Sequence, residues 1–511
     1  MASRRDELNA YTFAKKRLVA QFLQPSPTGT EEGAPRPVRA VVPGMVIAVV
    51  ILAGFGAWGM FKPTAPKGWD TAKEKVIIGS DSTTRYVVLK TNGKKQLHPV
   101  LNLASAKLLL DPSKGQVVKV DEKILDSGKL PHGATIGIPY APDRLPDKAE
   151  AESEKTWAVC ERPGGSTRAV QKAAFVFADR EKDKVEGKNR LRGGELMYVE
   201  GPGDKLYVVD KAGKKYPIEN DQKLLGAVVG VNKKPQRVSG QWLATLKTGD
   251  PIFFPEVGGT PNDPANVPGG QLDDQTNRVG AVLKARSSGQ MHYYVVVRGG
   301  VMPVSDFTAQ LLLSSEQLLD LGQNGEATQV SFGAFSPTEK EFGGTEDWPR
   351  EQSTSVNPEN ADTDGRNTFC NVLRDVGEKG GATLSTWAGE SFPATLPTGS
   401  TSAYVTPGSG QLFRQIQGTA AKDGGLFLVT DTGLRYAMQT NDDTDKDESE
   451  IGSDGKKESA EEKARKQQEG GAPARLGYAE VTPAPIPAAW SQFLPTGPRL
   501  STGSAKQPQG S

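Results

Sequence analysis

A chain of 511 residues is too long for one ordinary hydrophobic core, so several domains are expected. Its 62 Lys and Arg residues balance 61 Asp and Glu residues. This balance argues against a nucleic-acid binder, which usually shows a basic excess or a basic stripe. With 58 Gly, 36 Pro and only 36% hydrophobic residues, the composition favours turn-rich β structure with loops and disordered segments over helical bundles.

The N-terminal tail, residues 3–25, reads SRRDELNAYTFAKKRLVAQFLQP and predicts one amphipathic helix that ends at the proline. Its apolar side chains fall on one stripe, and Arg and Lys make the remaining surface basic. Such a helix suits either an anionic lipid surface or a partner protein, and the sequence does not distinguish the two. Residues 25–39, PSPTGTEEGAPRPVR, predict a flexible linker.

The next segment, residues 40–61, is the uncharged run AVVPGMVIAVVILAGFGAWGMF. As a helix it would be about 33 Å long, enough to cross a bilayer core of about 30 Å. The predicted span therefore begins at Ala40 and ends at Phe61, with Trp58 as an interfacial aromatic residue. A buried core helix fits poorly because the run is apolar on all faces. A cleaved signal peptide fits poorly because the run is long and starts late.

Basic residues near both ends of the span leave its orientation open under the positive-inside rule. The two cysteines of the chain, Cys160 and Cys370, both follow the span. Two cysteines on one side of a membrane favour a single disulfide in an oxidising compartment, and two unrelated buried thiols are the alternative. The disulfide interpretation predicts a single-pass plasma-membrane protein with a cytoplasmic N-terminus and an extracytoplasmic C-terminal part.

One short pattern occurs four times beyond the span. Residues 206–218, LYVVDKAGKKYPI, align without a gap with residues 426–438, LFLVTDTGLRYAM, and looser copies lie at 86–100 and 294–304. Each copy combines an apolar strand, a Gly turn and a second strand, which predicts a β-hairpin. An opening aromatic residue, a turn glycine and a closing proline mark the copies: Tyr86 and Pro99; Tyr207, Gly213 and Pro217; Tyr294 and Pro303; Phe427 and Gly433, with Ala437 in place of proline.

A Leu-rich helical stretch follows the first three hairpins, and a closing phrase recurs as LKTGDP at 246–251 and LPTGP at 494–498. LPHG at 130–133 is a looser echo of this phrase. A lone hairpin buries too little surface to be stable, so each copy must pack on a helix or on another copy. The cysteine-containing stretches flank copies two and three, and a disulfide between them would join both into one central module.

The predicted fold class is mainly β with short helices (α+β), one transmembrane helix and an elongated ectodomain of four hairpin–helix repeat domains around a split central domain. The predicted boundaries are 1–39 for the tail and linker, 40–61 for the span, 62–139 for repeat 1, 140–190 for the first central part, 191–255 for repeat 2, 270–325 for repeat 3, 326–408 for the second central part, 409–500 for repeat 4 with a disordered insert at 440–474, and 501–511 for a disordered tail.

This combination resembles the EccB family, a membrane core component of type VII (ESX) secretion systems. The opening RRDELNAYTFAKKRLV and the terminal LPTGPRL are its most specific marks. The resemblance implies a structural subunit that assembles with EccC, EccD, EccE and further copies of itself to anchor an extracytoplasmic domain for protein export. It also makes peptidoglycan a possible ligand, because EccB repeats are similar to cell-wall-binding modules of phage lysins.

Some EccB proteins are described as ATPases, but the sequence contains no GxxxxGK[ST] motif, so ATP hydrolysis is an alternative without a predicted site. His98, His132 and His292 stand beside repeats without a partner cysteine or an HExxH pattern. Three acidic residues near 445 mimic the start of a calcium loop, but Glu448 occupies the position that requires Gly. The sequence therefore predicts no catalytic residue, metal site or cofactor.

Overall fold

The computed structural model describes residues 4–23, 38–61, 65–164, 170–269, 271–359, 365–397, 402–418, 424–440 and 471–509. The chain divides into two compact units. The first unit comprises Met1–Lys67 with Val120–Lys129, and the second comprises Gly68–Lys119 with Leu130–Ser511.

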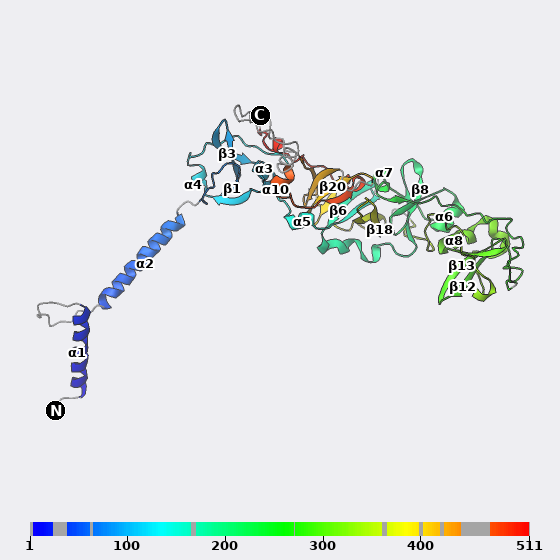
Figure 1. Cartoon of the computed structure of the whole chain (residues 1–511), viewed down its shortest axis with the longest axis horizontal. Helices are drawn as coiled ribbons and strands as arrows, with labels where there is room; N and C mark the ends of the chain where they lie inside the picture. The colour runs from blue at the N-terminus through cyan, green and yellow to red at the C-terminus, as the bar shows by residue number, and fades with distance from the viewer. Residues whose placement is uncertain are drawn as a thin grey trace, which may run out of the picture. The chain divides into compact units, whose positions relative to one another are not determined.

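The described residues of the first unit are mainly helical (Figure 1). Its described helices are α1 (Arg4–Leu23), α2 (Val38–Phe61) and the single-turn α4 (Glu122–Leu125). Pro43 lies inside α2, in its second turn, where it has no N–H to donate to the carbonyl of Arg39. The carboxylate of Asp121 accepts a hydrogen bond from the Lys123 N–H and so caps α4.

The second unit contains four small sheets built on one plan. In each, three consecutive strands form an antiparallel meander, and a strand that follows later in the chain pairs with the other edge of the first strand. The later strand runs parallel to the first in the three sheets for which that pairing is resolved. The strands are β1 (Lys75–Gly79), β2 (Arg85–Thr91), β3 (Lys94–Val100) and β4 (Gln116–Val120); β7 (Glu195–Glu200), β8 (Leu206–Val209), β9 (Lys214–Ile218) and β10 (Gln236–Arg237); β12 (Val282–Ser287), β13 (Gln290–Val297), β14 (Gly300–Val304) and β15 (Thr328–Gln329); and β20 (Gly410–Ile416), β21 (Gly425–Thr430), β22 (Arg435–Ala437) and β23 (Ala484–Pro487). The second sheet has two more strands, β11 (Lys247–Thr248) beside β9 and β16 (Thr354–Ser355) beside β7.

A short helix follows the third strand of each sheet. These helices are α3 (Leu103–Leu108), α6 (Gln222–Val228), α8 (Asp306–Ser314) and α10 (Ala472–Leu476). Asn102, Asp221 and Ser305 cap the first three of them by accepting a backbone N–H with their side chains. The helix buries apolar residues that the thin sheet alone would leave in water.

The hallmark residues of the four hairpins occupy equivalent positions in the sheets. Tyr86 lies opposite Pro99, Tyr207 opposite Pro217, Tyr294 opposite Pro303, and Phe427 opposite Ala437. In every copy the carbonyl of the second residue accepts a hydrogen bond from a later segment, at 2.8–3.0 Å from the N–H of Ile136, Ile252, Phe342 or Leu500. This pairing uses the carbonyl of the proline and not its missing N–H, so proline is tolerated there.

In repeats 1, 2 and 4 the residue that makes this pairing comes shortly after the closing phrase. The residue before the proline, or before Ala437 in repeat 4, has a ring in its side chain. This ring lies against the glycine of the closing phrase: His98 on Gly133, Tyr216 on Gly249, and Tyr436 on Gly497. A Cβ atom on any of the three glycines would overlap the ring. Glycine is therefore required because only a bare backbone can approach the ring so closely.

A fifth sheet unites the two cysteine-containing stretches. Its strand order is β18-β17-β5-β6-β19, so strands near residue 160 pair with strands near residue 370. The strands are β5 (Thr156–Pro163), β6 (Val170–Phe177), β17 (Thr368–Val376), β18 (Ala382–Gly389) and β19 (Ala403–Val405). Trp157 of this sheet packs edge-on against Phe413 of repeat 4, with ring centroids 5.4 Å apart. The same core cluster includes Trp242 and Trp490, so it joins the central sheet to repeats 2 and 4.

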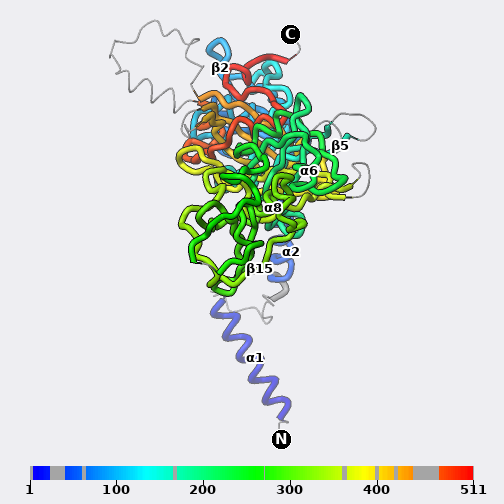
Figure 2. The backbone as a smooth tube through the Cα atoms, turned by 90° about the vertical axis from the view of Figure 1, so that its right-hand side faces the viewer, coloured from blue at the N-terminus to red at the C-terminus, as the bar shows by residue number. Residues whose placement is uncertain are grey.

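The predicted disorder of residues 501–511 is wrong for the part that the structure describes. Residues Thr502–Ala505 form α12, and Ser501, Thr502 and Ala505 are buried. The segment lies beside repeat 1 in Figures 1 and 2, where Pro508 forms a bridge with Ile136. Its small side chains allow this close packing. Because many of them are polar, the sequence shows no apolar pattern that would predict the packing.

The predicted disordered insert at 440–474 lies outside the described residues between 441 and 470, and so do the three acidic residues of the calcium-like pattern and Glu448. The end of that range is ordered: α10 begins at Ala472, and both Ala472 and Ala474 are buried. The fold as a whole is mixed α/β, with several small sheets and one candidate membrane helix.

Candidate functional site

The candidate membrane helix is the first feature that indicates a function. Among the residues that the structure describes, one helical segment, Val41–Gly59, is long and apolar enough to cross a membrane. Ala40, Trp58 and Phe61 of the predicted span all lie in α2, and the Trp58 side chain is 71% exposed. Because exposing such a helix to water is costly, a bilayer is the environment that fits it.

The disulfide is the second feature, and the predicted pairing is confirmed. Cys160 and Cys370 are bonded across a sequence separation of 210 residues. They lie directly opposite each other in β5 and β17, and both side chains are fully buried. The bond closes the long loop that contains repeats 2 and 3. The bond therefore holds the two central stretches together independently of the conformation of the loop.

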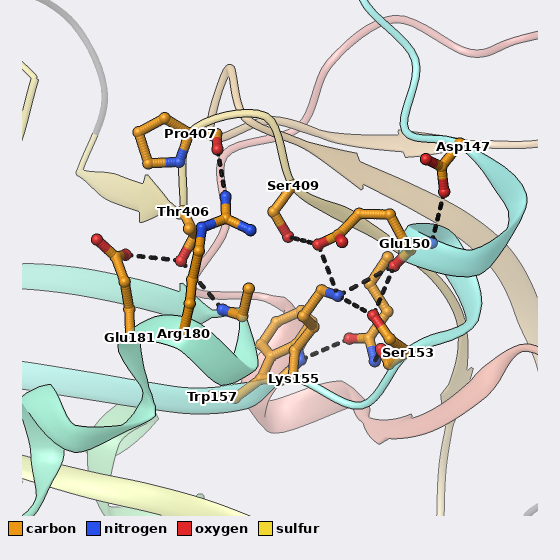
Figure 3. A network of polar contacts seen from close by, with 12 residues as sticks. Asp147, Glu150, Ser153, Lys155, Trp157, Arg180, Glu181, Thr406, Pro407 and Ser409 are labelled. Carbon is orange, nitrogen blue, oxygen red and sulfur yellow. Dashed lines mark hydrogen bonds and ion pairs between the residues drawn. The ribbon is translucent and has the colours of Figure 1, made fainter.

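A polar network joins α5 (Lys148–Glu152) and β5 to the loop before repeat 4 (Figure 3). The Lys155 side chain is 1% exposed, and its Nζ lies 3.0 Å from the Glu150 carboxylate. Lys155 also donates to the Glu150 carbonyl at 3.0 Å and to the Ser153 hydroxyl. The Ser409 hydroxyl donates to the same Glu150 carboxylate at 2.5 Å. All three protons of the buried ammonium thus have acceptors.

The network continues on both sides of this ion pair. The Gln411 amide N–H donates to the Ser153 carbonyl at 3.3 Å, and its oxygen accepts from the Trp157 indole at 2.8 Å. On the other side, the Thr406 hydroxyl donates to Glu181 at 2.7 Å, and Arg180 donates to the Pro407 carbonyl at 2.5 Å (Figure 3). These contacts bridge residues more than 220 positions apart in the chain.

Electrostatics in the network favour the charged forms. Burial opposes the ionisation of Glu150, but hydrogen bonds from Ser409 and Lys155 and the positive charge of Lys155 outweigh it. The pKa of Glu150 is therefore held below its ordinary value. Glu181 behaves in the same way: hydrogen bonds from Lys184, Thr406 and Tyr404 overcome burial and lower its pKa.

A second buried carboxylate joins the central sheet to repeat 2. Glu161 is fully buried and accepts hydrogen bonds from the Ser239 N–H at 2.7 Å and the Ser239 hydroxyl at 2.5 Å. Ser239 is the N-cap of α7 (Gly240–Leu243), so Glu161 holds the start of this short helix. Burial raises the pKa of Glu161, and the bonds from Ser239 and the charge of Lys172 offset only part of that effect.

The histidines that the sequence singled out are not brought together. His98 is buried, with its ring nitrogens 3.0 Å from the Ala134 carbonyl and 3.1 Å from the Thr91 hydroxyl. His132 packs edge-on against Tyr86, and His292 pairs with Ala285 in another sheet. Within the described ranges, no three His, Cys, Asp or Glu residues are grouped as metal ligands would be. The hallmark residues likewise lie in four separate sheets and shape no common pocket.

Among the described residues, a disulfide, a buried ion pair and a buried carboxylate that holds an N-cap serine join distant parts of one body. Sequence reasoning found the disulfide but missed Glu150, Lys155, Ser409 and Glu161. No local pattern marks these residues, since each looks like an ordinary surface residue until the fold buries it.

Known proteins with similar sequences come from ESX secretion systems. The sequence model of the family described as "Type VII secretion system ESX-1, transport TM domain B" matches residues 1–510. The ESX-1 secretion system ATPase EccB1 of Mycobacterium tuberculosis is 30% identical over 285 residues, which cover 54% of each protein. The chain thus spans about half the length of this relative. The ESX-3 secretion system ATPase EccB3 of Mycolicibacterium smegmatis is 25% identical over 79% of this chain and 76% of its own length.

Solved structures share the fold. A chain of the intact ESX-5 inner membrane complex is 20% identical, with a TM-score of 0.56, and the match covers 100% of this chain and 96% of that chain. The EccB3 dimer from the ESX-3 core complex gives a TM-score of 0.54 at 22% identity, covering 84% of this chain and 99% of that chain. The match of the family over nearly the whole length decides the assignment. This chain belongs to the EccB family of the ESX type VII secretion systems.

Proposed function

We propose that this chain is a structural subunit of an ESX inner-membrane complex, with α2 as its single span and the second compact unit on the extracytoplasmic side. The observation that carries the proposal is the family match over residues 1–510 of a chain that combines one candidate span with a disulfide-bonded body. The relatives with solved structures come from an ESX-5 inner membrane complex and an ESX-3 core complex.

The disulfide supports the orientation. Disulfides persist in oxidising compartments and are rare in the cytoplasm. Both cysteines follow α2, so an extracytoplasmic second unit places them where the bond is stable. The short α1 helix then lies on the cytoplasmic side. Its apolar residues Leu8, Tyr11 and Phe22 are exposed within the first unit, which suits docking on neighbouring subunits.

The proposed partners are relatives of EccC, EccD and EccE and further copies of the chain itself. The test is affinity purification of the full-length tagged chain, in mild detergent, from cells that carry the whole secretion locus. We expect EccC and EccD relatives to be retained in amounts comparable to the bait. A chain that is well expressed and folded but retains neither would contradict the subunit assignment.

An ATPase activity is the second candidate, because the matched relatives carry that word in their names. The sequence has no Walker A motif, whose glycine-rich backbone would wrap the phosphates. The full-length chain, purified without partners, is expected to hydrolyse ATP no faster than a heat-inactivated sample. Turnover that follows the chain through size-exclusion chromatography would support the second candidate instead.

A further inference from the structure

The tip of the β2–β3 hairpin concentrates positive charge. It reads KTNGKK over residues 90–95, so three lysines and no acidic residue surround the turn. Lys90, Lys94 and Lys95 are exposed, whereas Val88 and Leu97, where the two strands enter the core, are buried. The surrounding segment Gly68–Lys119 contains nine Lys and Arg residues against four Asp and Glu residues, in a chain whose net charge is only +1.

The positive charges of the tip lysines repel one another. Lys90 and Lys95 are direct cross-strand partners, and like charges in this position destabilise a hairpin. Lys95 donates to the carbonyl of Asp70 at 3.0 Å, which places its charge beside the segment that enters the unit. Neither Lys90 nor Lys94 makes an ion pair with another residue that the structure describes. An anion bound from outside would relieve the repulsion that the fold leaves in place.

The segment that enters the unit is fixed to the hairpin and follows α2 closely in the chain. Lys73 donates its backbone N–H to the Val88 carbonyl at 2.9 Å, and Trp69 is buried, so residues 69–73 are fixed to the hairpin. Asp70 follows the end of α2 by nine residues. A fully extended chain of nine residues spans about 30 Å. The chain between the end of α2 and Asp70 is therefore short enough to let the tip reach the headgroup layer.

We propose that Lys90, Lys94 and Lys95 form a docking surface for anionic phospholipid headgroups of the extracytoplasmic leaflet. Headgroup phosphates supply the negative charge that the tip lacks, and the short connection to α2 makes the membrane the anionic surface that the chain itself can bring to the tip. The inference rests on the extracytoplasmic placement proposed above. It accounts for the basic residues on that side of α2, where the positive-inside rule expects few.

The test uses the full-length chain reconstituted without partners into nanodiscs of phosphatidylcholine, alone or with phosphatidylglycerol. An uncharged amine-acetylating reagent modifies accessible lysines, and mass spectrometry gives the rate for each site. Lys205, Lys340 and Lys379 are internal controls: they are exposed, and none forms an ion pair with a described residue. Both leaflets of a nanodisc are alike, so the outcome depends neither on orientation nor on other subunits.

We expect phosphatidylglycerol to slow acetylation of the three tip lysines by about threefold or more and to leave the controls unchanged, with the effect lost in high salt. Equal tip rates in both lipids would overturn the proposal. Slow rates in both lipids that rise only when residues 441–470 are deleted would assign the tip to that acidic segment of the chain instead. Because no partner is present, a negative result here is separate from a failure of co-purification.

Discussion

The ion pair between Glu150 and Lys155 gives the sharpest prediction for stability. In the Glu150→Gln variant the Lys155 ammonium, with a side chain that is 1% exposed, keeps its two neutral acceptors but loses its counter-charge. Breaking a fully buried pair costs about 3–5 kcal/mol. The Glu150 side chain is 26% exposed, so water compensates part of this loss. We expect the free energy of unfolding to fall by about 2–3 kcal/mol.

A matched control lies on the same helix. Lys148 pairs with Glu480 at 3.2 Å, but the two side chains are 60% and 84% exposed. Lys148→Gln should therefore change the free energy of unfolding by no more than about 0.5 kcal/mol. In the double variant Glu150→Gln/Lys155→Met, the uncompensated charge is gone, and most of the lost stability should return. Together the three variants separate the effect of the charge from that of the lost contact.

The assay is guanidinium denaturation of the full-length chain in detergent, followed by tryptophan fluorescence. Trp157 belongs to the same network through Gln411, so it reports on this junction. The pKa of Glu150 is lowered in the folded state from an ordinary value of 4.5. Its contribution is therefore fully present above about pH 5 and is lost as the pH falls through the folded pKa. Glu150→Gln and Lys148→Gln curves that coincide at pH 7 would refute the reasoning.

Two further predictions concern the fold. Replacing both Cys160 and Cys370 by Ala should lower the free energy of unfolding by about 2–5 kcal/mol, because the bond closes a long loop. Dithiothreitol should lower the denaturation midpoint of the native chain, because it reduces the bond. It should leave the midpoint of the double variant unchanged. Gly497→Ala should cost about 1–3 kcal/mol because its Cβ would overlap the Tyr436 ring. Gly226→Ala in α6 should instead stabilise the fold by about 0.5–1 kcal/mol, because no atom lies within 4 Å of the added Cβ. Equal effects of the two glycine substitutions in thermal unfolding would contradict the packing argument.

The features that could be predicted from the sequence are local ones. An uncharged run of 22 residues has few interpretations, and turn signals such as Asn92-Gly93 mark a hairpin wherever they occur. A proline closes three of the copies, and the structure shows the role of this position: its carbonyl accepts a hydrogen bond from the closing segment, as the carbonyl of Ala437 does in the fourth. The recurrence of the closing phrase is visible in the sequence, but the contact of its glycine with a ring is visible only in the structure.

The features that could not be predicted depend on distant partners. The two-residue strands β10 and β15 exist only because a meander offers an edge, and two residues carry no periodicity. Glu150 meets Ser409, and Glu161 meets Ser239, through pairings that only the folded central sheet creates. The C-terminal residues 501–509 looked like a disordered tail because small polar side chains carry no apolar pattern, yet they pack on repeat 1.

The placement of the chain across the membrane is tested most directly by protease treatment of spheroplasts that express the chain with different epitope tags at its two ends. We expect the C-terminal tag to be lost and the N-terminal tag, joined to α1 and α2, to remain on a short protected fragment. The lost part should migrate as one disulfide-linked body when it is not reduced. A C-terminal tag that is digested only after the membrane is permeabilised would contradict the account.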